Sequence, residues 1–255
     1  MLWYKSWLDT RWRFLIGLAL LTCSAAGTVL AYPRIAALLP QVHPRPAAGE
    51  IGRRIQELLE LSRDYHGYVW AQSFRQNLPQ MATLFAVLLG TEGLLSRSSH
   101  SATRFMLSLP VSRTRLLGVR VSMGLAELLV LAVVPALVFP LLSPAIGTTY
   151  DVGGALVHGL CLFVACAVFF GLALLLSTVF DDVWRPVLIA CTVAVGLSLL
   201  GFIPGGLSRY SIFHLMTGES YFRTGAVPWL GLLTSAAASA ALVYTASVNI
   251  SRRDF

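Results

Sequence analysis

Apolar residues gather into six long stretches that short polar segments separate. The stretches cover residues 14–32, 78–95, 116–142, 153–180, 186–203 and 227–248. A helix needs about 20 mostly apolar residues to cross the hydrocarbon layer of a bilayer. The pattern therefore predicts an all-α, polytopic membrane protein with six transmembrane helices, forming one domain over residues 1–255.

The composition supports this interpretation. Apolar residues make up 56% of the chain and charged residues 12%, whereas a soluble domain carries about 25% charged residues. These values exclude a soluble enzyme domain, a disordered chain and a disulfide scaffold. All the cysteines fall within predicted spans, where no oxidising compartment can pair them: Cys23, Cys161, Cys166 and Cys191.

The distribution of charge predicts the orientation. With a cytoplasmic N-terminus, the inner segments hold eleven basic and four acidic residues, and the outer segments hold eight basic and six acidic residues. Basic residues favour the cytoplasmic side, so we expect both termini in the cytoplasm. The net charge of +7 then reports topology rather than nucleic-acid binding. The first stretch is too long for a typical signal peptide, and we expect it to stay as an anchored span.

Besides the inner segment 97–115, three segments outside the spans have predicted structures of their own. Residues 1–13 carry Trp3 and Trp7 among charges, which indicates either a short interfacial helix or an ordinary aromatic belt. Residues 33–77 form an extracytoplasmic loop with an amphipathic helix over 50–64, expected to pack on its own bundle or on a partner subunit. Residues 204–226 are too short for two crossings and indicate a shallow re-entrant segment.

The cytoplasmic segment 97–115 between spans two and three has an amphipathic pattern. Ala102, Phe105, Met106 and Leu109 share one helical face, and Pro110 ends the helix. Residues 97–120 contain five arginines and no acid. Such a helix can rest on anionic lipid, or it can dock a cytoplasmic partner. Both alternatives stay open on this pattern alone.

Signatures of catalysis are missing from the sequence. There is no G-x-S-x-G, H-E-x-x-H or C-x-x-C motif. The five histidines are scattered, so we predict no metal site and no resident cofactor. A Walker A motif needs Gly-Lys-Ser/Thr, and the only lysine, Lys5, follows a tyrosine. We therefore expect a chain that is not an enzyme and cannot bind ATP through its own P-loop.

Two carboxylates lie inside predicted spans, where a charge costs about 2.5–3.5 kcal/mol. Glu92 is close to Arg97 and is expected to reach the inner interface or to pair locally. Glu127 lies seven residues beyond Arg120, deeper in its span. Both carboxylates are candidates for gating or path lining, and Glu127 is the stronger one, either by pairing with an arginine or by lining a translocation path.

At the inner loop the sequence resembles the ABC-2 type transporter permeases. The resemblance rests on the run Gly90-Thr91-Glu92-Gly93-Leu94-Leu95-Ser96, on Phe105-Met106-Leu107-Ser108-Leu109-Pro110-Val111-Ser112-Arg113 with Arg115-Leu116-Leu117, and on the terminal Arg252-Arg253-Asp254-Phe255. Its most specific part is 107–117. The stretch 98–103 lacks the acidic, glycine-containing turn often found in that family.

The resemblance implies the transmembrane subunit of an ABC exporter in a bacterial inner membrane. Such a subunit dimerises with a second copy or a paralogue and works with a separate cytoplasmic ATPase, which binds ATP and Mg. The segment 97–115 would be its coupling segment, and the outer re-entrant segment would narrow the exit. The residues expected to couple to the ATPase are Arg104, Phe105, Met106, Leu109, Pro110 and Arg113.

Two other classes remain as alternatives. In a proton-coupled secondary carrier Glu127 would titrate, and transport would persist without an ATPase. A non-transporting scaffold or sensor would bind a partner through its outer loop and move no substrate. The sequence specifies neither the cargo nor the composition of the dimer.

Overall fold

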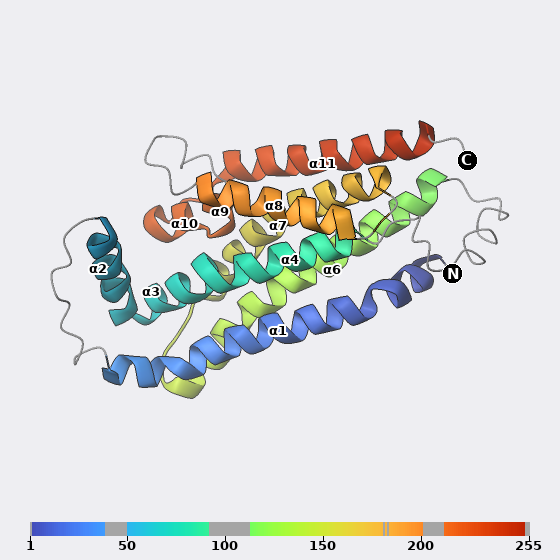
Figure 1. The fold of residues 1–255 in the computed structure, drawn as a ribbon. Coiled ribbons are helices and arrows are strands. Elements are labelled where there is room, and N and C mark those ends of the chain that lie inside the picture. The colour runs from blue at the N-terminus through green and yellow to red at the C-terminus, as the bar shows by residue number, and fades with distance from the viewer. Residues whose placement is uncertain are drawn as a thin grey trace.

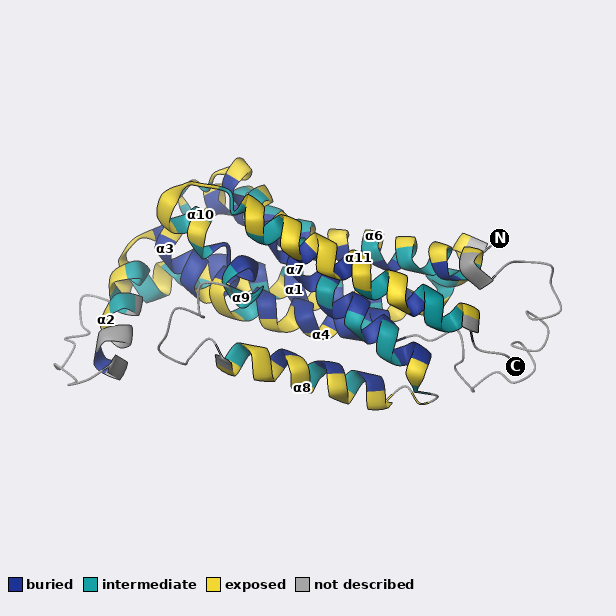
Figure 2. Cartoon of the chain, turned by 90° about the horizontal axis from the view of Figure 1, so that it is seen from above, coloured by how far each residue is buried: buried dark blue, intermediate teal, exposed yellow. Residues whose placement is uncertain are grey.

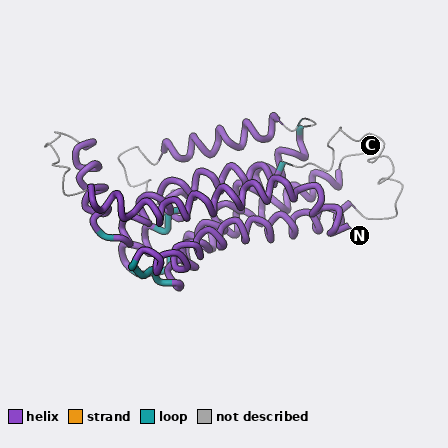
Figure 3. Tube along the Cα trace, turned by 90° about the horizontal axis from the view of Figure 1, so that it is seen from below, coloured by secondary structure: helices purple, strands orange, loops and turns teal. Residues whose placement is uncertain are grey.

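The computed structural model of the chain describes residues 2–38, 50–91, 113–180, 182, 184–200 and 212–252. Within this part every regular element is a helix, and short loops join the helices (Figures 1 and 3). The longer elements are α1 (Leu2–Leu38), α2 (Glu50–Arg63), α4 (Leu78–Gly90), α6 (Arg113–Leu142), α7 (Val152–Val179), α8 (Trp184–Leu200) and α11 (Trp229–Arg252). The shorter ones are α3 (Tyr65–Val69), η2 (Trp70–Asn77), η4 (Ser143–Ile146), α9 (Ile212–Met216) and α10 (Glu219–Thr224).

Four helices are long and apolar enough to cross a membrane. They cover Trp3–Leu38, Arg115–Ile146, Val152–Val179 and Trp229–Ser251. The helix α8 is apolar but shorter, and α4 reaches a spanning length only together with α3 and η2. In the described part the predicted all-helical architecture is therefore confirmed, with four helices suited to cross a membrane, whereas the number of six spans stays a prediction.

The N-terminal segment 1–13 does not form a separate interfacial helix where it is described. Residues from Leu2 onward continue directly into α1, a single helix of 37 residues. At 1.5 Å per residue this helix is about 55 Å long, against a hydrocarbon layer of about 30 Å. Its Trp3 and Trp12 are exposed near one end, as in an aromatic belt.

The predicted outer loop 33–77 is helical over much of its described part. Its amphipathic helix is observed as α2. Residues 65–77, however, form α3 and η2, which lead directly into α4. This segment packs in the bundle because one side of it is apolar: Val69, Trp70 and Phe74 are at most 1% exposed.

Two hydrogen bonds fix how α1 lies against the continuous helix formed by α3, η2 and α4. Ser73 Oγ donates to Thr28 Oγ1 at 3.0 Å, and Arg13 Nη1 donates to the carbonyl oxygen of Leu88 at 3.2 Å. The same step of 15 residues separates the two positions on each helix. The helices therefore run antiparallel in a constant register over about 22 Å.

The helix α7 lies at the centre of the bundle and packs against α4, α6 and α11. Small residues allow these contacts. A Cβ atom added at Gly90 would lie 2.6 Å from the carbonyl oxygen of Phe170, and Ser239 Oγ donates to the carbonyl oxygen of Ala167 at 3.0 Å. Figure 2 shows α8 along one edge of the bundle, with exposed residues along its length.

The long helices alternate in direction. The helix α1 begins, α4 ends, α6 begins and α11 ends at one end of the bundle (Figure 1). The short helices α9 and α10 lie at the opposite end with α2 and α3. We call the end at which α1 begins the N-terminal end, and the opposite end the hairpin end, after the α9–α10 hairpin.

Candidate functional site

Glu127, the predicted gating residue, is buried between α1 and α6. Its side chain is 3% exposed, and Thr10 Oγ1 donates a hydrogen bond of 2.5 Å to its Oε1. The same hydroxyl lies 3.1 Å from the carbonyl oxygen of Ser6. Hydrogen bonding of this kind stabilises a carboxylate that is removed from water. The structure thus places Glu127 in a helix–helix contact, and its role in gating stays a prediction.

We expect Thr10→Val to destabilise the fold by about 1.5–3 kcal/mol, the cost of removing a hydrogen bond to a charged group. The change keeps the shape of the side chain, so packing between the helices is preserved. Thr22→Val is the matched control, because Thr22 Oγ1 bonds only carbonyls of its own helix in the described part. Thermal unfolding in detergent measures both variants, and equal midpoints would show that Thr10 contributes nothing.

The remaining predicted site residues are not placed by the structure. Glu92 and most of the coupling residues lie outside the described residues; these coupling residues are Arg104, Phe105, Met106, Leu109 and Pro110. Arg113 begins α6, but its side chain is not described. Their roles stay predictions.

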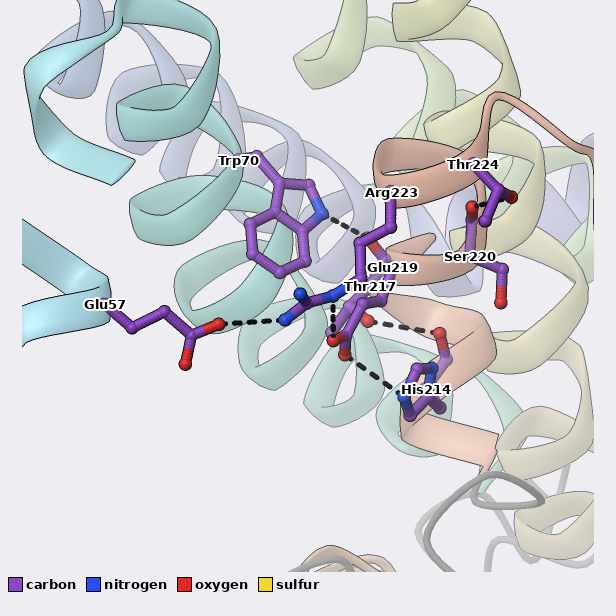
Figure 4. Close-up of polar contacts among 8 residues, drawn as sticks. All are labelled: Glu57, Trp70, His214, Thr217, Glu219, Ser220, Arg223 and Thr224. Carbon is purple, nitrogen blue, oxygen red and sulfur yellow. Dashed lines mark hydrogen bonds and ion pairs between the residues drawn. The ribbon is translucent and has the colours of Figure 1, made fainter. Parts of the chain in front are cut away.

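A network of charged residues joins α2 to the α9–α10 hairpin (Figure 4). Arg223 lies at its centre: Nη2 donates to Glu57 Oε1 at 2.8 Å, and Nε donates to Glu219 Oε1 at 2.7 Å. His214 Nε2 lies 3.2 Å from the other oxygen of Glu219. The hydrogen bonds to Glu219 and then to Glu57 raise the pKa of Arg223, so its charge persists and holds the two acids together.

Trp70, next to this network, anchors the α9–α10 hairpin to the bundle. Its Nε1 donates to the carbonyl oxygen of Thr217 at 3.0 Å. Its ring stacks on Phe222 with centroids 4.4 Å apart. Trp70 is fully buried, so this contact ties α10 to the interior of the bundle, whereas the Arg223 pairs lie at the surface.

His158 of α7 lies beneath the turn of the hairpin. Its ring stacks on Phe74 at 4.6 Å and meets Tyr221 edge-on at 5.5 Å. Gly218 adopts a left-handed conformation with φ of +60°, and a Cβ atom there would lie 2.3 Å from His158 Nδ1. The structure thus places His158 in a packed aromatic setting.

These rings belong to a larger aromatic cluster at the hairpin end. Successive ring centroids lie 4.6–6.3 Å apart. Aromatic pairs at such distances contribute about 0.5–1.5 kcal/mol beyond their buried area. The members are Tyr32, Tyr65, His66, Tyr68, Phe74, Phe139, Tyr150, His158 and Tyr221.

Tyr150 of this cluster predicts a loss of stability in alkaline solution. Burial, and then the neighbouring Tyr65, Tyr221 and Asp151, raise its pKa above the ordinary 10.0. The neutral phenol is therefore favoured in the folded state, and stability present below about pH 10 is lost as the pH rises. Unfolding midpoints should be measured between about pH 8 and pH 11, a range that brackets the ordinary phenol pKa of about 10. They should fall less steeply with rising pH in Tyr150→Phe than in the unchanged protein. Identical pH profiles would contradict this assignment.

A polar face on η2 and α4 escaped the sequence analysis. Gln72, Arg75, Gln76 and Gln80 are all exposed, and the Arg75 guanidinium lies 5.6 Å from the ring centre of Trp70. The sequence assigned most of this segment to a loop. The spacing of Gln72, Gln76 and Gln80 at i, i+4 and i+8, opposite buried aromatic residues, is the signal that could have revealed a helix.

The described residues form no evident metal centre. No group of three or more His, Cys, Asp or Glu side chains is arranged there to hold a metal ion. A shallow pocket of about 310 Å³ lies between α2 and the hairpin, lined by Glu57, Glu60, Leu61, Asp64, Gly67, Phe222 and Arg223. This pocket is open and adjoins the Arg223 network.

Comparison with known proteins adds no relative. No protein-family model, no curated protein and no solved structure matches this chain.

Proposed function

We propose that the chain is the membrane-spanning permease subunit of an ATP-driven ABC exporter in a bacterial inner membrane. It forms the translocation path as a dimer and couples to a separate cytoplasmic ATPase. In this proposal six helices cross the membrane. The combined helix α3–η2–α4 and the helix α8 join the four longer spans, and both termini lie in the cytoplasm.

One observation carries the proposal. The segment that resembles the ABC-2 permeases, residues 107–117, follows α4 in the chain and runs into the start of α6. The helix α4 ends and α6 begins at the N-terminal end of the bundle. The first and last helices start and finish at that same end. An arginine-rich connection on the side of both termini is the arrangement that a cytoplasmic ATPase needs. The missing P-loop lysine supports a separate ATPase subunit.

The hairpin end supports the same proposal. The α9–α10 hairpin precedes the last long helix and packs against α7 and α11. In an exporter this hairpin and the Arg223 network would close the outer exit. Transport would then follow alternating access, with ATP binding or hydrolysis in the partner shifting the balance between two conformations.

The test is association with an identified ATPase. The tagged chain, expressed in its source cells and purified in mild detergent, should carry an ABC ATPase and hydrolyse ATP. The double charge reversal Arg104→Glu/Arg113→Glu should remove both the ATPase and the activity. The matched control Arg34→Glu/Arg63→Glu reverses two exposed arginines near the hairpin end and should retain both. Normal association in the first variant would overturn the docking assignment.

A transport assay separates the other two classes. Vesicles that hold the chain alone should show no flux without the ATPase and ATP. Flux driven by a proton gradient would instead indicate a secondary carrier, with Glu127 as the titrating group. A chain that binds a partner tightly and supports no flux in any condition would be a scaffold or sensor.

A further inference from the structure

We infer that the polar face of η2 and α4, formed by Gln72, Arg75, Gln76 and Gln80, lines a water-filled path through the outer half of the membrane. We further infer that Arg75 binds an anionic group of the cargo there. The inference rests on the proposed function, because it names the residues and the charge of the path that an exporter would need.

The register between α1 and the continuous helix α3–η2–α4 gives the depth of this face in the membrane. Counting from the bond between Ser73 and Thr28, Arg75 lies level with Ala26, and Gln80 lies level with Leu21. The apolar run of α1 covers residues 14–32. Arg75 is thus about 9 Å inside the end of that run at 1.5 Å per residue, and Gln80 is near its middle.

A charge at this depth does not face lipid without cost. An arginine at the bilayer centre costs about 2.5–3.5 kcal/mol, so such residues face the bundle interior or an aqueous cavity. The polar face does not point into its own bundle, because the opposite side of the helix, with Trp70, Phe74 and Leu78, fills the core. The face belongs to a helix that packs against both α1 and α8. Water within an assembly is the environment that suits it.

The chemistry of the face selects for anions. Arg75 supplies a permanent positive charge, and the three glutamines offer amide donors and acceptors without charge. In the described part no carboxylate forms an ion pair with Arg75; its neighbour is the face of Trp70, at 5.6 Å. An arginine that is positioned by an aromatic ring and not neutralised by an acid is suited to a carboxylate, phosphate or sulfate group.

Cysteine labelling tests whether water reaches the face. The background carries Cys23→Ala and Cys191→Ala, since Cys161 and Cys166 are buried. A water-soluble methanethiosulfonate reacts with the thiolate and therefore needs water at the site. Added from outside, it should modify Gln80→Cys at least about tenfold faster than Leu20→Cys. Leu20 is 49% exposed on α1 at nearly the same depth, but faces lipid in this account. Equal rates would overturn the water path.

A pair of oppositely charged reagents tests the anion preference. In Gln76→Cys, the positive charge of Arg75 should raise the labelling rate of the anionic sulfonatoethyl reagent relative to that of the cationic trimethylammonium-ethyl reagent. Adding Arg75→Gln should lower the ratio of the two rates by about tenfold, and Arg75→Lys should preserve it. An unchanged ratio in Arg75→Gln would overturn the role of Arg75.

These labelling rates are measured without an ATPase. If the chain binds no ATPase and still shows the expected labelling rates, the proposed exporter function is refuted and the water-filled path stands. A chain that binds the ATPase and shows equal rates at Gln80→Cys and Leu20→Cys would refute the path alone.

Discussion

Replacing Gly218 by alanine should unfold the hairpin end of the bundle or leave it severely destabilised. At φ of +60° the new side chain carries the strain of a left-handed conformation, about 1–2 kcal/mol. Its Cβ would also lie 2.3 Å from His158 Nδ1, so the histidine or the turn must move. The surroundings are packed aromatic rings that leave little room. We expect a total loss of about 3 kcal/mol or more, measured as the midpoint of thermal unfolding in detergent.

Gly225 offers a matched control for the backbone strain. Its φ is +69°, and a Cβ added there meets no atom of the described chain within 4 Å. Gly225→Ala should therefore cost only the strain of about 1–2 kcal/mol. In the double variant His158→Ala/Gly218→Ala the overlap is gone, so the further loss caused by Gly218→Ala should shrink to the same amount. Equal effects of Gly218→Ala and Gly225→Ala would contradict the close packing of the turn on His158.

Gly90→Ala should give the second-largest effect, because it forces α4 away from the central helix α7. The added Cβ would lie 2.6 Å from the carbonyl oxygen of Phe170 and 2.9 Å from the Cβ of Ala173. A backbone oxygen cannot rotate away as a side chain can, so the two helices must separate. The expected cost is about 2–3 kcal/mol, again measured as the unfolding midpoint.

Gly118 of α6 is the control for the intrinsic effect of alanine in a helix. No atom of the described chain lies within 4 Å of a Cβ added there. Gly118→Ala should be neutral or stabilising by up to about 1 kcal/mol, since alanine is the better helix former. If Gly90→Ala behaved in the same way, the close approach of α4 and α7 would not exist in the protein.

The periodic and apolar features of the sequence predicted most of the helices. The predicted stretches 116–142, 153–180 and 227–248 correspond to α6, α7 and α11, and the amphipathic helix over 50–64 corresponds to α2. These elements could be predicted because an uninterrupted apolar run or a helical repeat is a local property. Residues 65–77 were predicted as a loop because Gln72, Arg75 and Gln76 give this helix a polar composition, and its helical signal is limited to the spacing of its glutamines.

The contacts within the candidate sites were beyond prediction from one sequence. Glu127 stood out because a carboxylate in an apolar run is costly, but nothing local identifies Thr10, 117 residues away, as its partner. Gly218 and His158 are likewise distant in sequence, and the close approach that leaves no room for a Cβ atom at Gly218 arises from tertiary packing. The polar face likewise depends on the continuous helix α3–η2–α4, which begins at Tyr65.

The central claim is that α3–η2–α4 and α8 cross the membrane along with the four longer helices. Thr149, between η4 and α7, and Asp182, between α7 and α8, distinguish the possibilities, and both are exposed. With six spans and a cytoplasmic N-terminus, Thr149 lies outside the cell and Asp182 lies inside. If only the four longer helices cross, the two positions exchange sides.

The most direct measurement is labelling of intact cells with a membrane-impermeant thiol reagent in the Cys23→Ala/Cys191→Ala background. The six-span account predicts that Thr149→Cys is modified in intact cells and that Asp182→Cys is modified only after the cells are opened. Modification of Asp182→Cys in intact cells, with Thr149→Cys protected, would contradict it.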